Sequence, residues 1–129
     1  MAERHETKTV LIIEDVADVR NFASKVLELE GYRVLQAEDG DTGLRLAREN
    51  PVALALLDLT LPKRSGWAVM EQMKSEPEPS AIPVIVFTAS ARVSQRERAL
   101  SMGAADYLVK PLSAAKLRKT VARILRQKR

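Results

Sequence analysis

The stretch VALALLDLTLPKRSG, residues 52–66, decides the fold. Val52 to Leu57 form an uninterrupted apolar run that stops at Asp58, and Pro62 and Gly66 then mark a loop. A strand that is buried on both faces has this continuous apolar pattern, which is typical of the centre of a parallel sheet. We therefore predict a central strand over 52–57 that presents Asp58 at its carboxyl end.

Strand and helix patterns alternate on both sides of this run. Short apolar runs predict the other strands, and apolar residues at helical spacing predict the helices. The alternation indicates an α/β fold in which a five-stranded parallel sheet is doubly wound, with five helices on its two faces in a three-layer sandwich. The expected strands are Val10–Ile13, Arg33–Ala37, Val84–Thr88 and Tyr107–Val109; the expected helices are 16–27 with its apolar face on Val16, Val19, Phe22, Ala23, Val26 and Leu27, Thr42–Glu49, Trp67–Lys74, a fourth capped by Ser94, and a last one capped by Ser113.

Length and composition bound the chain to one ordinary domain. Its 129 residues fit a single domain, which we assign to 1–129, with a flexible tail at 1–8 that includes a solvated His5. There is no cysteine, so disulfides and thiolate metal sites are excluded. No apolar run approaches the roughly 20 residues that span a bilayer, and the first residues are polar. We expect a cytoplasmic protein without membrane contact.

Charge is distributed unevenly along the chain. The net charge is +4, yet residues 1–91 carry a net −5 and residues 92–129 a net +9. A cationic patch favours nucleic acid, an anionic membrane or an acidic protein, while a solvated helix pair is the simpler interpretation. No DNA-binding helix-turn-helix follows the last expected helix, so we expect no direct nucleic-acid binding.

Polar side chains follow several of the predicted strands. Glu14 and Asp15 end the first strand, Asp58 the third and Thr88 the fourth, and Lys110 follows the fifth. Ligand sites in open α/β sheets lie at the carboxyl ends of the strands, so these residues should converge. Clustered carboxylates need a compensating cation, and an all-oxygen set suits Mg²⁺. With the lysine, such a site can support attack of a carboxylate on a phosphoryl group.

The motifs LIIED, LLDLTLPKRSG, VIVFTAS and GAADYLVKP, in this order, resemble the receiver domain of bacterial response regulators of two-component systems. The resemblance covers about Thr9 to Leu125 and implies a flavodoxin-like fold. It implies Asp58 as phospho-acceptor, Thr88 and Lys110 as ligands of the phosphoryl oxygens, and Thr88 and Tyr107 as the switch, in which Tyr107 turns inward when Thr88 moves toward the phosphate. The implied Mg²⁺ ligands are Glu14 acting largely through water, Asp15, Asp58 and the backbone carbonyl of Thr60; the Lys110–Pro111 bond is expected to be cis.

The resemblance also implies partners. A histidine kinase or a histidine phosphotransfer protein would donate the phosphoryl group, and the protein would catalyse only its own phosphorylation and dephosphorylation rather than act as an enzyme. Phosphorylation would switch the surface formed by the fourth helix, fifth strand and fifth helix for a downstream protein partner, with a homodimer as a further outcome. Since this surface is basic, the partner is expected to be acidic.

Four other interpretations compete with a stand-alone phosphorelay protein. A pure interaction scaffold that has lost phosphorylation is disfavoured because every expected catalytic side chain is present. The chain could be a receiver cut from a larger response regulator or hybrid kinase. A flavodoxin-like metal-dependent phosphatase is disfavoured because Thr60 stands where such an enzyme has a second catalytic Asp. A flavin-binding module is disfavoured because VADVR, residues 16–20, replaces a phosphate-binding loop after the first strand.

Overall fold

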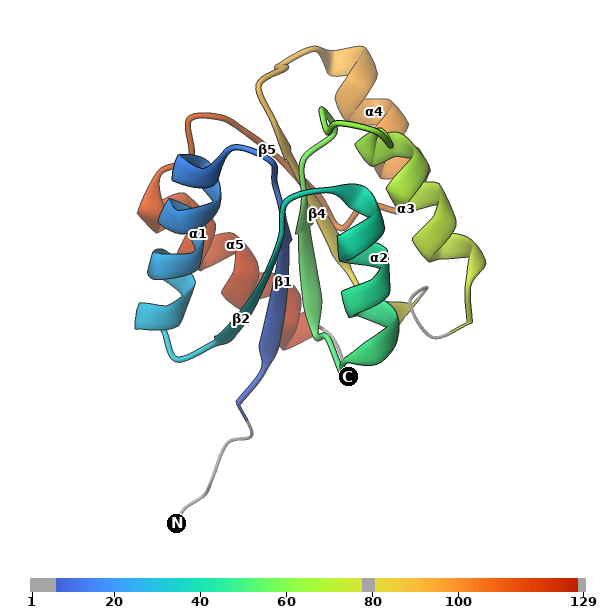
Figure 1. The fold of residues 1–129 in the computed structure, drawn as a ribbon. Helices are drawn as coiled ribbons and strands as arrows, with labels where there is room; N and C mark the ends of the chain where they lie inside the picture. Colours follow the sequence, from blue (N-terminus) through green and yellow to red (C-terminus); the bar gives the residue numbers. More distant parts are fainter. Residues whose placement is uncertain (1–6, 78–80, 128–129) are drawn as a thin grey trace.

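The computed structural model describes residues 7–77 and 81–127. Within these ranges five strands alternate with five helices along the chain (Figure 1). The strands are β1 (Thr9–Ile13), β2 (Arg33–Ala37), β3 (Leu54–Leu57), β4 (Val84–Thr88) and β5 (Asp106–Val109). The helices are α1 (Ala17–Leu29), α2 (Gly40–Glu49), α3 (Gly66–Ser75), α4 (Val93–Ser101) and α5 (Ala114–Gln127).

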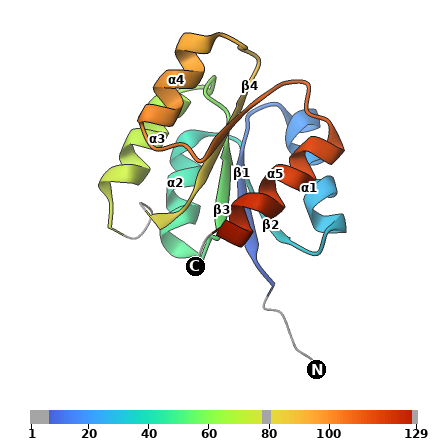
Figure 2. The same ribbon diagram turned by 180° about the vertical axis from the view of Figure 1, so that it is seen from behind.

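The strands form one parallel sheet in the order β2-β1-β3-β4-β5. Helices α1 and α5 cover one face of the sheet, and α2, α3 and α4 cover the other (Figures 1 and 2). The predicted flavodoxin-like three-layer sandwich is therefore confirmed. From β1 the chain first winds outward to β2 and then returns to β3, so the switch point of the strand order lies between β1 and β3.

The core explains why the strands are continuous apolar runs. Successive side chains of a strand point to opposite faces of the sheet. Leu11 and Ile13 join the apolar cluster beneath α2, α3 and α4, whereas Val10 and Ile12 join the cluster beneath α1 and α5. Because both faces are covered, every residue of β1 and β3 is buried and no alternation with polar residues remains.

Helix starts follow their capping residues, with one correction. The Asp39 carboxylate accepts the Thr42 N–H at 2.8 Å, and the Ser113 hydroxyl oxygen accepts the Lys116 N–H at 2.9 Å, as N-caps do. The prediction that Ser94 caps α4 is wrong, because Arg92 is the N-cap and Ser94 lies inside the helix. The Ser90 hydroxyl accepts the Arg92 N–H at 3.2 Å, so the chain turns into the helix earlier than the pattern suggested.

Two other sequence predictions need adjustment. Helical spacing predicts Val16 and Phe22 on the apolar face of the first helix, but their exposed fractions are 49% and 43%. The third strand begins at Leu54, although Val52 before it is buried. Residues 1–6 of the predicted tail, His5 included, lie outside the described residues. No helix in the described part of the chain is long and apolar enough to cross a bilayer.

Candidate functional site

Strand register brings the predicted site residues to one edge of the sheet. Ile13 pairs with Leu57, so Glu14 and Asp58, the next residues, emerge side by side from β1 and β3. Thr88 pairs with Val109, which places Thr88 next to the turn that begins at Lys110. The Lys110 N–H donates to the Thr88 carbonyl at 2.8 Å and continues this pairing. The prediction that these strand ends converge is confirmed.

Three carboxylates form an acidic cluster at this edge. One oxygen each of Glu14, Asp15 and Asp58 lie within 4.8 Å of one another, a spacing from which they could hold one ion together. Glu14 and Asp58 are buried, while Asp15 is exposed. The donor set is all oxygen and anionic, which is the set that a hard divalent cation such as Mg²⁺ takes. The residues therefore fit the predicted metal.

Lys110 neutralises part of this charge. Its ammonium lies 2.6 Å from Glu14 Oε1 and 2.9 Å from Asp58 Oδ2, so one cation bridges the ends of β1 and β3. Burial works against the charged ammonium, but the hydrogen bonds to Glu14 and Asp58 outweigh it and raise the pKa of Lys110. The lysine therefore stays cationic at this edge. Its peptide bond to Pro111 is cis, as predicted.

Glu14 is the most enclosed member of the acidic cluster. Its side chain has no exposed surface, and its Oε2 accepts the Val16 N–H at 2.9 Å. Burial, opposed by the hydrogen bonds from Lys110 and Val16, raises the pKa of Glu14. A buried carboxylate with a raised pKa is held in its ionised form by the neighbouring cation, which makes Glu14 dependent on Lys110 or on a metal.

The β3–α3 loop fixes Asp58. Its N–H donates to the Ile13 carbonyl at 3.1 Å, and its Oδ1 accepts the Thr60 N–H at 3.1 Å. The Gly66 N–H closes the loop by donating to the Leu59 carbonyl at 2.9 Å. A Cβ on Gly66 would collide with the Asp58 carbonyl oxygen, so only glycine lets the start of α3 come this close. The role of the Thr60 carbonyl in metal binding stays a prediction.

A cavity of about 470 Å³ lies between the β3–α3 and β4–α4 loops, and its lining includes Leu59, the residue that follows Asp58. Thr60, Trp67, Thr88 and Gln95 contribute to its lining. Thr88 is only 3% exposed, at the end of a strand next to the lysine turn. Trp67 packs against the apolar core, and the Arg98 guanidinium of α4 lies 4.0 Å from its ring centroid. This cation–π contact joins α3 to α4 and was not predicted.

Tyr107 is turned into the protein. The ring is buried, and its hydroxyl donates to the Ser90 carbonyl at 2.8 Å. This bond links β5 to the β4–α4 loop that begins next to Thr88. The aromatic residue predicted as a switch therefore lies in an inward position here, held by a hydrogen bond that sequence could not reveal because its acceptor is a backbone atom 17 residues away.

Sequence reasoning also missed Arg20. This arginine of α1 donates through Nη1 to the Glu14 carbonyl at 2.8 Å and to the Asp15 carbonyl at 3.4 Å. Its Nε donates to Gln36 Oε1 at 3.1 Å. The only signal in the sequence is a basic residue within two turns of the acidic pair, a position that ordinary surface arginines also occupy.

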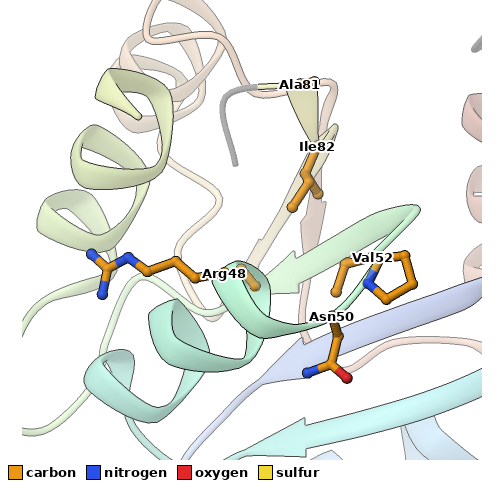
Figure 3. Close-up of a pocket in the computed structure, with 7 residues that line it drawn as sticks. Arg48, Asn50, Val52, Ala81 and Ile82 are labelled. Atoms are coloured by element: carbon orange, nitrogen blue, oxygen red, sulfur yellow. The ribbon is translucent and has the colours of Figure 1, made fainter. Parts of the chain in front are cut away.

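A second pocket lies away from these residues. Figure 3 shows the approximately 190 Å³ pocket between the end of α2 and the chain that enters β4. The Arg48 guanidinium points away from Ile82 and pairs with Glu76, and Asn50 donates to the Leu46 carbonyl at 3.0 Å (Figure 3). The polar side chains of Arg48 and Asn50 are thus already bonded within the protein, and the pocket includes none of the predicted site residues.

The sequence is similar to a known protein family and to curated relatives. Residues 10–122 match the family model of the response regulator receiver domain. Protein PilH of Pseudomonas aeruginosa is 34% identical over 116 residues, which cover 90% of this chain and 96% of that protein. The "Probable transcriptional regulator ycf27" of Porphyridium aerugineum is 34% identical over 122 residues, covering 95% of this chain and 50% of that protein. The chain thus spans about half the length of that regulator.

Solved structures give the same result. The CheY-like receiver domain of Methanospirillum hungatei superposes with a TM-score of 0.88 at 26% identity, covering 95% of this chain and 97% of that one. A receiver domain from Clostridium thermocellum superposes with a TM-score of 0.85 at 27% identity, covering 94% and 96%. The likeness extends over nearly the whole length of both chains.

Proposed function

Because the chain belongs to the response regulator receiver domain family, we propose that Asp58 is its phospho-acceptor. The observation that carries this proposal is the bridge from Lys110 to both Asp58 and Glu14. This bridge places a cation beside Asp58 that can bind an oxygen of the incoming phosphoryl group, inside an acidic cluster suited to Mg²⁺. Glu14 shares the lysine but has no exposed side-chain surface, and within the described residues no lysine ammonium lies within 4.0 Å of the Asp15 carboxylate.

The transfer starts from a phosphohistidine on a histidine kinase or a histidine phosphotransfer protein. An Asp58 carboxylate oxygen attacks the phosphorus, a P–O bond forms, and the P–N bond breaks as the imidazole leaves with the electron pair. Negative charge builds on the three equatorial oxygens of the phosphoryl group. Lys110 moves from Asp58 Oδ2 to one of these oxygens, and the Thr88 hydroxyl donates to another.

Glu14, Asp15, Asp58 and the Thr60 carbonyl would hold the metal. Bound Mg²⁺ supplies positive charge that offsets the charge of the transferring oxygens. The backbone has its own part, since the Thr60 N–H already binds Asp58 Oδ1 and so leaves Oδ2, on the side of Lys110, as the attacking oxygen. The Asp58 carboxylate is oriented before the donor arrives.

Phosphorylation acts on Tyr107 through Thr88. A phosphate adds charge and strong acceptor oxygens, which draw the Thr88 hydroxyl and its loop toward Asp58. The Ser90 carbonyl belongs to the same loop and already accepts the Tyr107 hydroxyl. The inward position of Tyr107 is then the state that phosphorylation favours, and the surface of α4, β5 and α5 follows it.

We propose that the downstream partner binds this surface and is acidic. Tyr107, Val109 and Lys116 are among the residues that line a hollow of about 350 Å³ there. Within residues 7–77 and 81–127, neither Lys116 nor Lys119 has an acidic group within 4.0 Å, so both are available to an acidic segment. A homodimer on phosphorylation would use the same surface. We propose the cytoplasm as the location, since a chain without cysteine suits a reducing compartment.

Receiver domains are signalling phospho-acceptors, and we propose that this chain turns over no other substrate. A relative from Vibrio cholerae carries the name "Probable cyclic di-GMP phosphodiesterase", but this chain covers only 27% of that protein. A receiver that belongs to a larger regulator or hybrid kinase would use the same Asp58 chemistry. The phosphatase alternative lacks a second acid at Thr60, whose backbone N–H instead binds Asp58.

Intact mass spectrometry after incubation with phosphoramidate, a small P–N donor, tests this function. We expect one added phosphoryl group that requires Mg²⁺ and is absent from Asp58→Ala. Asp41→Ala, which removes an exposed acid of α2, is the matched control and should be modified like the wild type. An Asp58→Ala protein that is modified at the wild-type rate would refute the assignment.

A further inference from the structure

Arg20 of α1 reaches back to the loop that carries the acidic pair. Its Nη1 donates to the Glu14 carbonyl at 2.8 Å and makes a longer contact of 3.4 Å with the Asp15 carbonyl. The Arg20 N–H also donates to the Val16 carbonyl at 3.0 Å, at the first turn of α1. One residue therefore binds three successive carbonyls of the β1–α1 loop.

Glu14 and Asp15 depend on this loop to different degrees. Glu14 is also held by its own N–H, which donates to the Ala37 carbonyl at 3.0 Å, and by bonds from Val16 and Lys110 to its carboxylate. Within the described residues, no group donates a hydrogen bond to the Asp15 carboxylate. Within the described residues, the hydrogen bonds that hold Asp15 therefore act on its backbone, and Arg20 binds the carbonyl oxygen on each side of the Asp15 Cα.

Gln36 orients Arg20 in turn. The Gln36 side chain comes from β2, the edge strand next to β1, and its Oε1 accepts the Arg20 Nε–H at 3.1 Å. The guanidinium is planar and rigid, so a bond at Nε fixes the direction in which Nη1 points. The chain of contacts runs from β2 through α1 to the acidic loop and never touches Asp58.

We infer that Arg20 is a positioning residue. By holding the β1–α1 loop, it keeps Asp15 in the orientation that binds the divalent cation. This inference rests on the proposed function, because it requires that Asp15 be a metal ligand. Repulsion and positioning predict opposite effects of Arg20 on metal affinity. A cationic side chain near a cation site should weaken metal binding by repulsion, whereas a positioning residue should strengthen it. Removal of Arg20 therefore separates the two effects.

The test compares Mg²⁺ affinity by isothermal titration calorimetry in the wild type, Arg20→Met, Arg20→Lys and Arg45→Met. Arg45 is the matched control, an exposed arginine of α2 whose one ion pair among the described residues is with Glu49 of its own helix. We expect Arg20→Met to bind Mg²⁺ about tenfold more weakly, as outer residues that orient metal ligands typically do. Arg20→Lys can reach one carbonyl but not Gln36 as well, so it should recover part of the loss; Arg45→Met should match the wild type.

A second measurement does not involve the metal. In the metal-free protein, amide hydrogen exchange at Asp15 and Val16 should be faster in Arg20→Met than in Arg45→Met, since the loop loses a donor. If Arg20→Met does not fold, Gln36→Ala replaces it and should show a smaller loss of affinity in the same direction. Affinity equal to or above that of the wild type in the folded variant would overturn the inference. A wild type that binds no Mg²⁺ would instead refute the proposed function.

Discussion

The Lys110 ammonium lies 2.9 Å from Asp58 Oδ2, although the two residues are 52 positions apart in the sequence. The same ammonium is 2.6 Å from Glu14, so the ends of two neighbouring strands share one cation. The contact carries two functions, because the lysine stabilises buried carboxylates in the resting protein and is placed to bind a phosphoryl oxygen during transfer.

Lys110→Met should destabilise the protein and make it dependent on metal. Loss of the cation leaves Glu14 and Asp58 buried without a partner, and the free energy of unfolding at pH 7 should fall by about 3 kcal/mol. Mg²⁺ should restore more stability to this variant than to the wild type. Urea unfolding with and without Mg²⁺ measures both effects, with Lys119→Met as control, since this exposed lysine has no ion pair in the part of the chain that the structure describes.

The same variant should respond to pH. The pKa of Glu14 is raised by burial even in the wild type, so without Lys110 the carboxyl group should take up a proton more readily. A carboxyl group whose pKa is higher in the folded state binds protons on folding, and its destabilising effect fades as the pH falls. The stability gap to the wild type should therefore narrow between pH 7 and pH 5, and a constant gap would contradict this explanation.

Tyr107→Phe should lose the bond to the Ser90 carbonyl. Because the hydroxyl is buried and the acceptor is left without it, we expect a loss of about 1 kcal/mol in the free energy of unfolding. Tyr32→Phe is the control, since no hydrogen bond involves that hydroxyl within the described residues. Equal effects of the two substitutions in urea unfolding would mean that the Ser90 bond contributes nothing.

Gly66→Ala should disturb Asp58 directly. An added Cβ would lie 2.5 Å from Leu59 Cα and still closer to the Asp58 carbonyl oxygen, and backbone atoms cannot turn away as a side chain can. We expect a loss of about 2 kcal/mol in stability together with slower phosphoryl uptake. Gly40→Ala, at the start of α2, meets mainly the Val69 side chain and should cost less. Thermal unfolding and intact mass would rank the two variants.

Glu76 should contribute to acid stability through Arg48. The hydrogen bond from Arg48, followed by that from Gln72, lowers the pKa of Glu76 to about 2. A carboxylate whose pKa is lowered in the folded state stabilises the protein at pH values above its ordinary pKa of 4.5. This stabilisation is lost as the pH falls toward the folded-state pKa of about 2. The difference in urea midpoint between wild type and Glu76→Gln should shrink over this range, and a difference that stays the same down to low pH would rule out this contribution of Glu76.

The fold could be predicted because its evidence is local. The run 52–57 and its counterparts are apolar throughout since both faces of the sheet are covered, and parallel strands must end at one edge. The convergence of Glu14, Asp58, Thr88 and Lys110 follows from that topology alone. Their assignment to phosphoryl transfer required the resemblance of four motifs in order.

Other features could not be predicted from the sequence because they depend on contacts between backbone atoms and distant side chains. Arg20 and Tyr107 both donate to carbonyl oxygens, which every residue carries and no motif marks. Ser94 has the residue type of a frequent N-cap, but the turn made by Ser90 starts the helix earlier. Phe22 fits the helical spacing yet is exposed, since spacing does not tell how wide the buried face of α1 is.

The most direct test of the central claim is to identify the modified residue. The protein is phosphorylated with acetyl phosphate and Mg²⁺, reduced with borohydride, which converts an aspartyl phosphate to homoserine, and analysed by peptide mass spectrometry. We predict homoserine at position 58, with Asp15 unchanged. Homoserine at position 15 with an intact Asp58, or no reduced residue at either position, would contradict the account.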